Sequence, residues 1–270
     1  MTRWLAALTV LVVTGAAHAQ PPQGDAVRGL ALMNAFRDSL PQYSGNRLRC
    51  TSCHLDNGTR PTAMSWNGAA ARYPRFRSRP GASESLARRV NECIARSLAG
   101  RMLHENSREM RDMLAYLESL RRAPRPAPVD SVKLVGVAAR GRAGYAATCA
   151  RCHGDRGQGT ALAPAAWGAD SYSVGAGFAR QFTLATFLRH NMPFDHLVTL
   201  SDREAADIAA FVLTQPRQDH PGKERDWPAG DPPSDAAYAT NGARRAGRAL
   251  PPPRPLLPRR VPPDSLIPRR

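Results

Sequence analysis

Apolar residues recur at helical spacing in several stretches of the chain. Positions three or four residues apart lie on one face of an α-helix, so such a set predicts a helix with one buried face. The sets are Ala26, Leu30, Met33 and Phe36; Met110, Met113, Leu114 and Leu117; and Ala205, Ile208, Ala209 and Val212. No run of alternating β-branched residues competes with them, and the pattern therefore predicts an all-α fold.

Capping signals precede the two later sets. Asn106 is followed three positions later by Glu109, and Ser201 by Glu204. A short polar side chain before a helix accepts hydrogen bonds from its first free N–H groups, and an acidic residue three positions on can reach back to it. We therefore expect one helix to begin after Asn106 and another after Ser201.

Two motifs share the pattern Cys-x-x-Cys-His: Cys50, Cys53 and His54, and Cys149, Cys152 and His153. In c-type cytochromes the two thiols of this motif bind haem covalently, and the histidine becomes the proximal ligand of the iron. A zinc half-site or a redox dithiol is the alternative for one motif alone. Two motifs, with no second Cys-x-x-Cys beside either to complete a four-thiolate site, favour two covalently bound haem c groups.

The motifs also mark an internal repeat. Cys149 follows Cys50 by 99 positions, about the length of one small cytochrome c domain. In each half a helix-forming stretch precedes the motif, and a loop-rich middle and a further helix follow it. We therefore expect two class I cytochrome c-like domains in tandem.

Changes in composition mark the boundaries. Residues 1–19 combine Arg3, an apolar run and small residues at Ala17 and Ala19, which is typical of a secretory signal peptide. The run is too short for a membrane span, so we expect a periplasmic protein without stable membrane insertion after cleavage rather than one with a retained anchor. The predicted N-terminal catalytic domain is 20–120, the linker "RRAPRPAPVD" is 121–130, and the electron-transfer domain is 131–216.

Residues 217–270 lose the periodic apolar pattern. The last twenty residues contain eight prolines and five arginines. Such a composition buries too little apolar surface to offset the entropy of ordering. We expect a disordered, basic, proline-rich tail.

The formal net charge is +16 at pH 7. The arginines are scattered, and an exported chain meets little nucleic acid, so we expect no nucleic-acid partner. Basic charge is better suited to attracting small anions or an acidic redox partner.

The second haem needs a sixth ligand, and Met192 is the candidate. It precedes Pro193 in a non-periodic segment just before the last predicted helix, and a thioether ligand opposite histidine raises the reduction potential. His190 and His196 are rival ligands, and a packing role for Met192 is the plain alternative.

The lone cysteine, Cys93, occupies the matching place in the first half. Cys93 lies 39 residues beyond His54, and Met192 lies 39 residues beyond His153. A free cysteine is commonly a small buried hydrophobe, but the matched spacing favours ligation of the first iron. The rival ligands are His104, Met102 and Met64.

Thiolate ligation would lower the potential of the first haem, so electrons would run from the first haem to the second. On a helix, Arg89, Arg96 and Ser97 share a face with Cys93. Cationic neighbours favour the thiolate and also form an anion pocket. Nearby arginines at positions 75, 77 and 79 are further candidates for that pocket.

Three segments, "CTSCHLDNGT", "YPRFRSRPG" and "RRVNECIARSLAG", resemble the dihaem thiosulfate dehydrogenases, periplasmic enzymes that couple two thiosulfates into tetrathionate. The resemblance covers roughly residues 25–215 and is more specific in the N-terminal half. It implies thiosulfate binding beside the first haem near arginines, with Cys93 as iron ligand and as a nucleophile that forms a transient adduct. It also implies that Met192 ligates the electron-transfer haem.

The chain departs from this family at one place. Some relatives carry lysine before the methionine, where this chain has Asn191, so ligand switching at the second haem is not expected from the resemblance. Two other functions stay open at this point. One is a dihaem electron carrier without a substrate, and the other is the thiolate-haem cytochrome subunit of the sulfur-oxidising multienzyme system. In each case we expect an external electron acceptor, such as a small cytochrome c.

Overall fold

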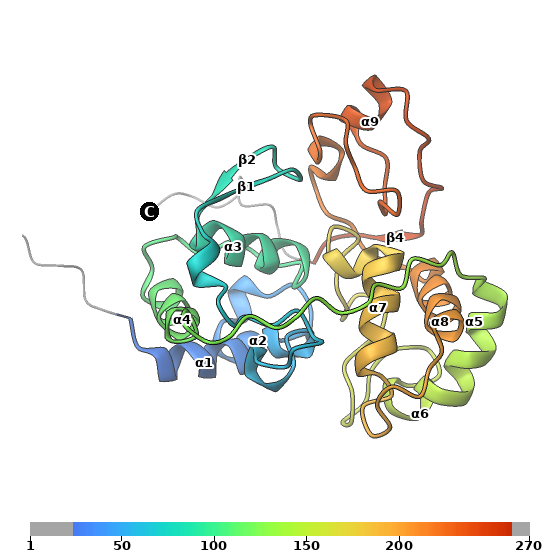
Figure 1. Cartoon of the computed structure of the whole chain (residues 1–270), viewed down its shortest axis with the longest axis horizontal. Coiled ribbons are helices and arrows are strands. Elements are labelled where there is room, and N and C mark those ends of the chain that lie inside the picture. Colours follow the sequence, from blue (N-terminus) through green and yellow to red (C-terminus); the bar gives the residue numbers. More distant parts are fainter. Residues whose placement is uncertain (1–23, 261–270) are drawn as a thin grey trace, which may run out of the picture.

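The computed structural model describes residues 24–260, which form two helical domains that lie side by side (Figure 1). The first domain contains α1 (Ala26–Asn34), α2 (Phe36–Ser39), α3 (Leu86–Arg96) and α4 (Arg108–Ser119). The second contains α5 (Ala138–Gly144), α6 (Ala150–His153), α7 (Gln181–Asn191) and α8 (Asp202–Thr214). The predicted helical fold with two domains is confirmed.

The same helix crossing forms the centre of each domain. Helix α1 packs on α4, and α5 packs on α8. A Cβ atom added at Gly29 would lie 2.0 Å from the carbonyl oxygen of Asp112, and one added at Gly141 would lie 1.8 Å from that of Asp207. Only glycine permits such a close approach of two backbones. Gly29 therefore sets the helix crossing in the first domain, and Gly141 sets it in the second.

A buried aspartate completes each crossing. Asp112 accepts a hydrogen bond of 2.8 Å from the Asp25 N–H, and Asp207 accepts one of 2.7 Å from the Val137 N–H. Each carboxylate also forms an ion pair with an arginine of the first helix, Arg28 or Arg140. The two carboxylates thus satisfy free N–H groups at helix starts, where the macrodipole favours negative charge.

The capping predictions have different outcomes. Ser201 and Glu204 form the expected capping box at the start of α8. For α4 the prediction was wrong by one residue, because the Ser107 hydroxyl accepts from the Met110 N–H and serves as the N-cap. Asn106 instead donates its own N–H to His104 Nδ1 at 3.2 Å.

Two small sheets accompany the helices. Strands β1 (Arg75–Arg77) and β2 (Ala82–Glu84) form an antiparallel hairpin that projects beside α3, as Figure 1 shows. Strands β3 (Arg217–Gln218) and β4 (Leu256–Leu257) pair in parallel. The apolar pattern did not predict these strands, which are only two or three residues long.

The prediction of a disordered tail is wrong for residues 217–260. This segment folds over the second domain and includes α9 (Asn241–Arg245) (Figure 1). It then returns to its own start, where β4 pairs with β3. Trp227 is 3% exposed and Tyr238 is 8% exposed, and Arg217 and Gln218 are fully buried. The reason is that these side chains and their hydrogen bonds supply burial without helical periodicity. Residues 261–270 and the predicted signal peptide 1–19 lie outside the described residues.

Between residues 24 and 260, no helix has both the length and the apolar character that crossing a bilayer requires.

Candidate haem and substrate site

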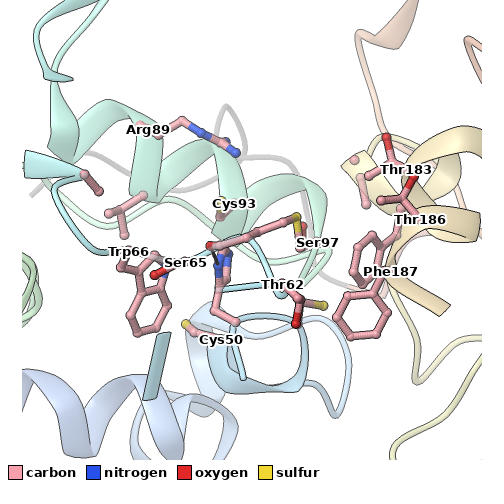
Figure 2. Close-up of a pocket in the computed structure, with 18 of the residues that line it drawn as sticks. Cys50, Thr62, Ser65, Trp66, Arg89, Cys93, Ser97, Thr183, Thr186 and Phe187 are labelled. Atoms are coloured by element: carbon pink, nitrogen blue, oxygen red, sulfur yellow. Dashed lines mark hydrogen bonds between the residues drawn. The ribbon is translucent and has the colours of Figure 1, made fainter. Parts of the chain in front are cut away.

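A cavity of about 730 Å³ lies at the junction of the two domains. The first Cys-x-x-Cys-His motif, α3, the interdomain linker and α7 all contribute to its wall. Figure 2 shows Cys93 descending from α3, Cys50 below it, and Thr183, Thr186 and Phe187 facing them from α7. The cavity is of the size expected for a cofactor or ligand site.

His54 is oriented by the backbone. Its Nδ1 atom lies 2.7 Å from the carbonyl oxygen of Met64, so Nδ1 carries the proton and donates it. The lone pair is therefore on Nε2, as an iron ligand requires. Burial lowers the pKa of His54 to about 4, which keeps the imidazole neutral. The Trp66 ring packs beside it with a centroid separation of 4.9 Å.

The two thiols of the first motif line the same cavity as Cys93. Burial, and then the charge of nearby Cys93, raise the pKa of Cys50 to about 12 and that of Cys53 to about 12. All three cysteines are free of disulfide bonds. Two free thiols at this spacing, followed by the oriented imidazole of His54, are the donor set to which haem c is covalently attached.

Helix α3 positions Cys93 together with two of the residues predicted to act with it. Ser85 caps the helix by accepting from the Arg88 N–H, and Ser97 ends it. Arg89 and Ser97 line the cavity with Cys93, and Figure 2 shows all three along this helix. The charge of Cys93 raises the pKa of Arg89, so the guanidinium and the sulfur are electrostatic neighbours.

Arg96 is on the same helix but is not part of the cavity wall. Its Nε donates to Glu92 at 2.5 Å, and its two terminal nitrogens donate to Asp226 at 2.8 Å each. Arg96 is 8% exposed. The structure therefore joins this arginine to the C-terminal segment and does not bring it to the predicted anion pocket.

The rival ligands for the first iron differ in position. Met64 lines the cavity. His104 is exposed and accepts from the Asn106 N–H, and Met102 accepts from Arg88 at 3.5 Å. Neither His104 nor Met102 is in the cavity wall.

The wall of the cavity is strongly cationic. It includes eight basic residues and, among the residues described, no acidic one. The basic residues are Arg49, Arg72, Arg75, Arg77, Arg89, Arg125, Lys133 and Arg180. Arg125 and Lys133 come from the linker and its continuation, and Arg180 precedes α7. Sequence reasoning missed these three, and also Arg49 and Arg72, although the arginine-rich linker was itself a signal.

Arg79, the remaining arginine of the segment at 75–79, lies elsewhere. Its guanidinium stacks on the Trp227 ring at 4.7 Å and donates to the Gly175 carbonyl oxygen at 2.8 Å. Burial lowers its pKa. This arginine ties the β1–β2 hairpin to the C-terminal segment.

The second motif has the same local arrangement. His153 Nδ1 lies 2.7 Å from the Pro164 carbonyl oxygen, which again leaves the lone pair on Nε2. Burial raises the pKa of Cys149 to about 11. Tyr145, one turn before Cys149, donates its hydroxyl proton to the Gly154 carbonyl oxygen at 2.8 Å. Both motifs thus present two thiols and one oriented imidazole.

Met192 is the C-cap of α7 and packs, partly buried, against the hydrophobic core. Of its rivals, His190 donates from Nε2 to the Asp130 carbonyl oxygen at 3.0 Å, and His196 is exposed. His190 is therefore held by the linker, whereas Met192 stays the candidate ligand.

These donor sets fit haem c. A haem requires two thiols, an imidazole with a free Nε2, and a second axial donor. The first motif provides them with Cys93 or Met64 in the cavity. The second motif provides the thiols and the imidazole, and Met192 is the candidate for its second axial donor. The cationic wall around the first motif also suits the propionates of a haem and a small anion.

Comparison with known proteins gives the same assignment. Residues 41–123 match the family described as SoxA/TsdA, cytochrome c domain. Residues 136–212 match the family described as cytochrome c oxidase, cbb3-type, subunit III. Both are cytochrome c domains, and they imply covalently bound haem c.

Relatives that match most of the chain are more specific. A thiosulfate dehydrogenase from Psychrobacter arcticus is 38% identical over 222 residues, which cover 77% of this chain and 68% of the relative. One from Allochromatium vinosum is 36% identical over 209 residues, covering 71% and 77%.

A solved structure agrees. Thiosulfate dehydrogenase (TsdBA) from Marichromatium purpuratum, in its "as isolated" form, superimposes with a TM-score of 0.68 and 28% identity over 78% of this chain. The match spans half of that solved chain. From these relatives, the cytochrome c domains and the cavity that both domains share, we conclude that the chain belongs to the thiosulfate dehydrogenase family.

Proposed function

We propose that this protein is a periplasmic cytochrome c with two haems that oxidises thiosulfate to tetrathionate. The observation that carries the proposal is the placement of Cys93 within the cavity of the first haem motif, beside Arg89 and Ser97. A third thiol at the haem site, beyond the two of the motif, suits sulfur chemistry, which a carrier with no substrate does not need.

The four motif cysteines would hold the haems covalently, with His54 and His153 as proximal ligands. We assign Cys93 as the sixth ligand of the first haem and Met192 as that of the second. Bound haem supplies one-electron redox chemistry to the site. A thiolate ligand favours the ferric state and a thioether the ferrous state, so this pair of ligands directs electrons from the first site to the second.

The cationic wall supports binding of an anionic substrate. Thiosulfate is a small dianion, and eight basic residues without an acidic neighbour in the wall lower the free energy of an anion there. Arg89 and Ser97 lie beside Cys93 and would contact the substrate. Arg96 is engaged by Glu92 and Asp226, so we assign it to the support of α3 instead.

The reaction joins two thiosulfate ions through their sulfane sulfur atoms. One sulfur–sulfur bond forms, no bond to oxygen breaks, and two electrons leave for an external acceptor. That acceptor is a redox protein such as a small cytochrome c, and the high positive charge of this chain favours an acidic one.

The test uses the purified holoprotein with thiosulfate and ferricyanide. We expect ferricyanide reduction that depends on thiosulfate, with formation of tetrathionate, and loss of this activity in Cys93→Ser. A wild-type protein that passes electrons between cytochromes but ignores thiosulfate would show that it is a carrier. Normal turnover by Cys93→Ser would remove the cysteine from the mechanism.

A further inference from the structure

Asn191 is the last residue of α7, and its side chain is fully buried. Its carboxamide makes three hydrogen bonds. The Thr62 hydroxyl donates to Asn191 Oδ1 at 2.8 Å, and Asn191 Nδ2 donates to the carbonyl oxygens of Thr62 and Phe187, both at 3.1 Å. Two of these bonds are reciprocal between Asn191 and Thr62, and they join the two domains.

Thr62 belongs to the loop that orients the first proximal histidine. Met64, two residues further on, supplies the carbonyl oxygen that accepts from His54 Nδ1. Thr62 and Phe187 also line the interdomain cavity, and Figure 2 shows Thr62 opposite Phe187. One short loop therefore hydrogen-bonds both the imidazole of His54 and the side-chain carboxamide of Asn191.

Met192 follows Asn191 directly. The helix ends at this point, and beyond Met192 the segment 193–199 is mostly exposed. A neutral thioether is a weak ligand whose retention depends on the chain that holds it near the iron. Because Asn191 is anchored by three hydrogen bonds, the backbone entering Met192 has a fixed position and direction.

We propose that Thr62 and Asn191 are positioning residues that keep Met192 on the iron of the second haem, so that a loop of the first haem site controls ligation at the second. This inference rests on the proposed function, which supplies the second haem and the Met192–iron bond. The added element is the pair of hydrogen bonds between Thr62 and Asn191, which connects the two redox sites and involves no residue of either Cys-x-x-Cys-His motif.

A bond that only satisfied a buried amide would affect folding stability without affecting ligand exchange at the iron. Displacement of Met192 by an external ligand separates these two roles. Imidazole competes with methionine for ferric haem, and the weak long-wavelength absorption band of methionine-bound ferric haem reports the fraction displaced.

The test compares Thr62→Val with two matched variants of the holoprotein. Thr62→Ser keeps the hydroxyl. Thr59→Val removes a hydroxyl from the same loop whose hydrogen bond, to the Asp56 carbonyl oxygen at 2.6 Å, stays within that loop. Thr62→Ala is a second variant in case valine packs poorly at this half-buried position.

Loss of one buried hydrogen bond should weaken the hold on Met192. We therefore expect imidazole to displace Met192 in Thr62→Val at about tenfold lower concentration than in the wild type. The reduction potential of its second haem should fall, and Thr62→Ser and Thr59→Val should behave like the wild type.

An unchanged imidazole titration and potential in both Thr62→Val and Thr62→Ala would overturn the inference while leaving the proposed function intact. Absence of the methionine band in the wild type would instead refute the Met192 assignment in the proposed function, and the inference with it.

Discussion

Arg96 and Asp226 are 130 positions apart in the chain and form two parallel hydrogen bonds of 2.8 Å in the interior of the protein. Tyr238 donates a third bond to the same carboxylate at 2.5 Å. Because Arg96 is on the helix that carries Cys93, the C-terminal segment is a structural support of the wall of the interdomain cavity. The Trp227 N–H adds a contact with the hairpin by donating to the Arg79 carbonyl oxygen at 2.7 Å.

Asp226→Ala should destabilise the protein strongly. Removing one partner of a buried ion pair leaves the other charge without that partner and is strongly destabilising. Glu92 remains beside Arg96 and limits the effect, so we expect a loss of about 3 kcal/mol in unfolding free energy. The measurement is denaturant unfolding of the holoprotein.

The matched control is Asp195→Ala, which removes an equally bidentate pair with Arg151 whose side chains are each 49% exposed. Water screens an exposed pair, so we expect a much smaller loss of stability in this variant. Equal losses in the two variants would show that the Arg96–Asp226 pair has no special role.

Gly141→Ala should disrupt the α5–α8 crossing. The new methyl group would meet the Asp207 carbonyl oxygen at 1.8 Å, so one helix must move. Overpacking of this kind costs about 1–3 kcal/mol. Gly177→Ala is the control, because an added Cβ there has no neighbour within 4 Å. Thermal melts of the two variants that coincide would contradict the crossing described here.

Asp207 should make the second domain sensitive to acid. Hydrogen bonds from Arg140, opposed in part by burial, hold the pKa of Asp207 below its ordinary value. A depressed carboxyl pKa stabilises the fold at pH values above the unfolded-state pKa, and this stabilisation is lost as the pH falls through the folded-state pKa.

Asp207→Asn should therefore be less stable than the wild type at pH 7, and the difference should shrink as the pH falls below about 4. Unfolding curves measured across this range check the prediction. A difference that is independent of pH would mean that Asp207 acts through its shape and not through its charge.

Arg125 should contribute to substrate affinity. It reaches the cavity from the linker, where it adds positive charge without a carboxylate nearby in the described wall. We expect Arg125→Gln to raise KM for thiosulfate by about tenfold, with a smaller change in kcat and a weaker dependence of KM on salt. Arg108→Gln, at a side chain 69% exposed on α4, should leave KM unchanged. Equal KM values for the two variants would exclude this role for the linker.

Local features of the sequence predicted much of this molecule. The helices follow from apolar spacing, and the motifs define both thiol pairs with their histidines. The equal spacing of Cys93 and Met192 from those histidines is informative because the two domains share one plan, so it indicated a lone cysteine at the cavity.

Contacts between distant segments were beyond prediction. Arg96 shares a helix face with Cys93, but its partner Asp226 lies in a segment whose composition suggested disorder. Thr62 and Asn191 meet only because the domains pack against each other. Arg125 reaches the cavity because the linker crosses it, and no periodicity encodes that path.

The most direct test of the central claim is the electron paramagnetic resonance spectrum of the oxidised holoprotein. The account predicts two low-spin ferric signals in the wild type, one with the g-values typical of histidine/thiolate ligation, and loss of that signal in Cys93→Ser. A wild-type spectrum without a thiolate signal, or one that is unchanged in Cys93→Ser, would contradict it.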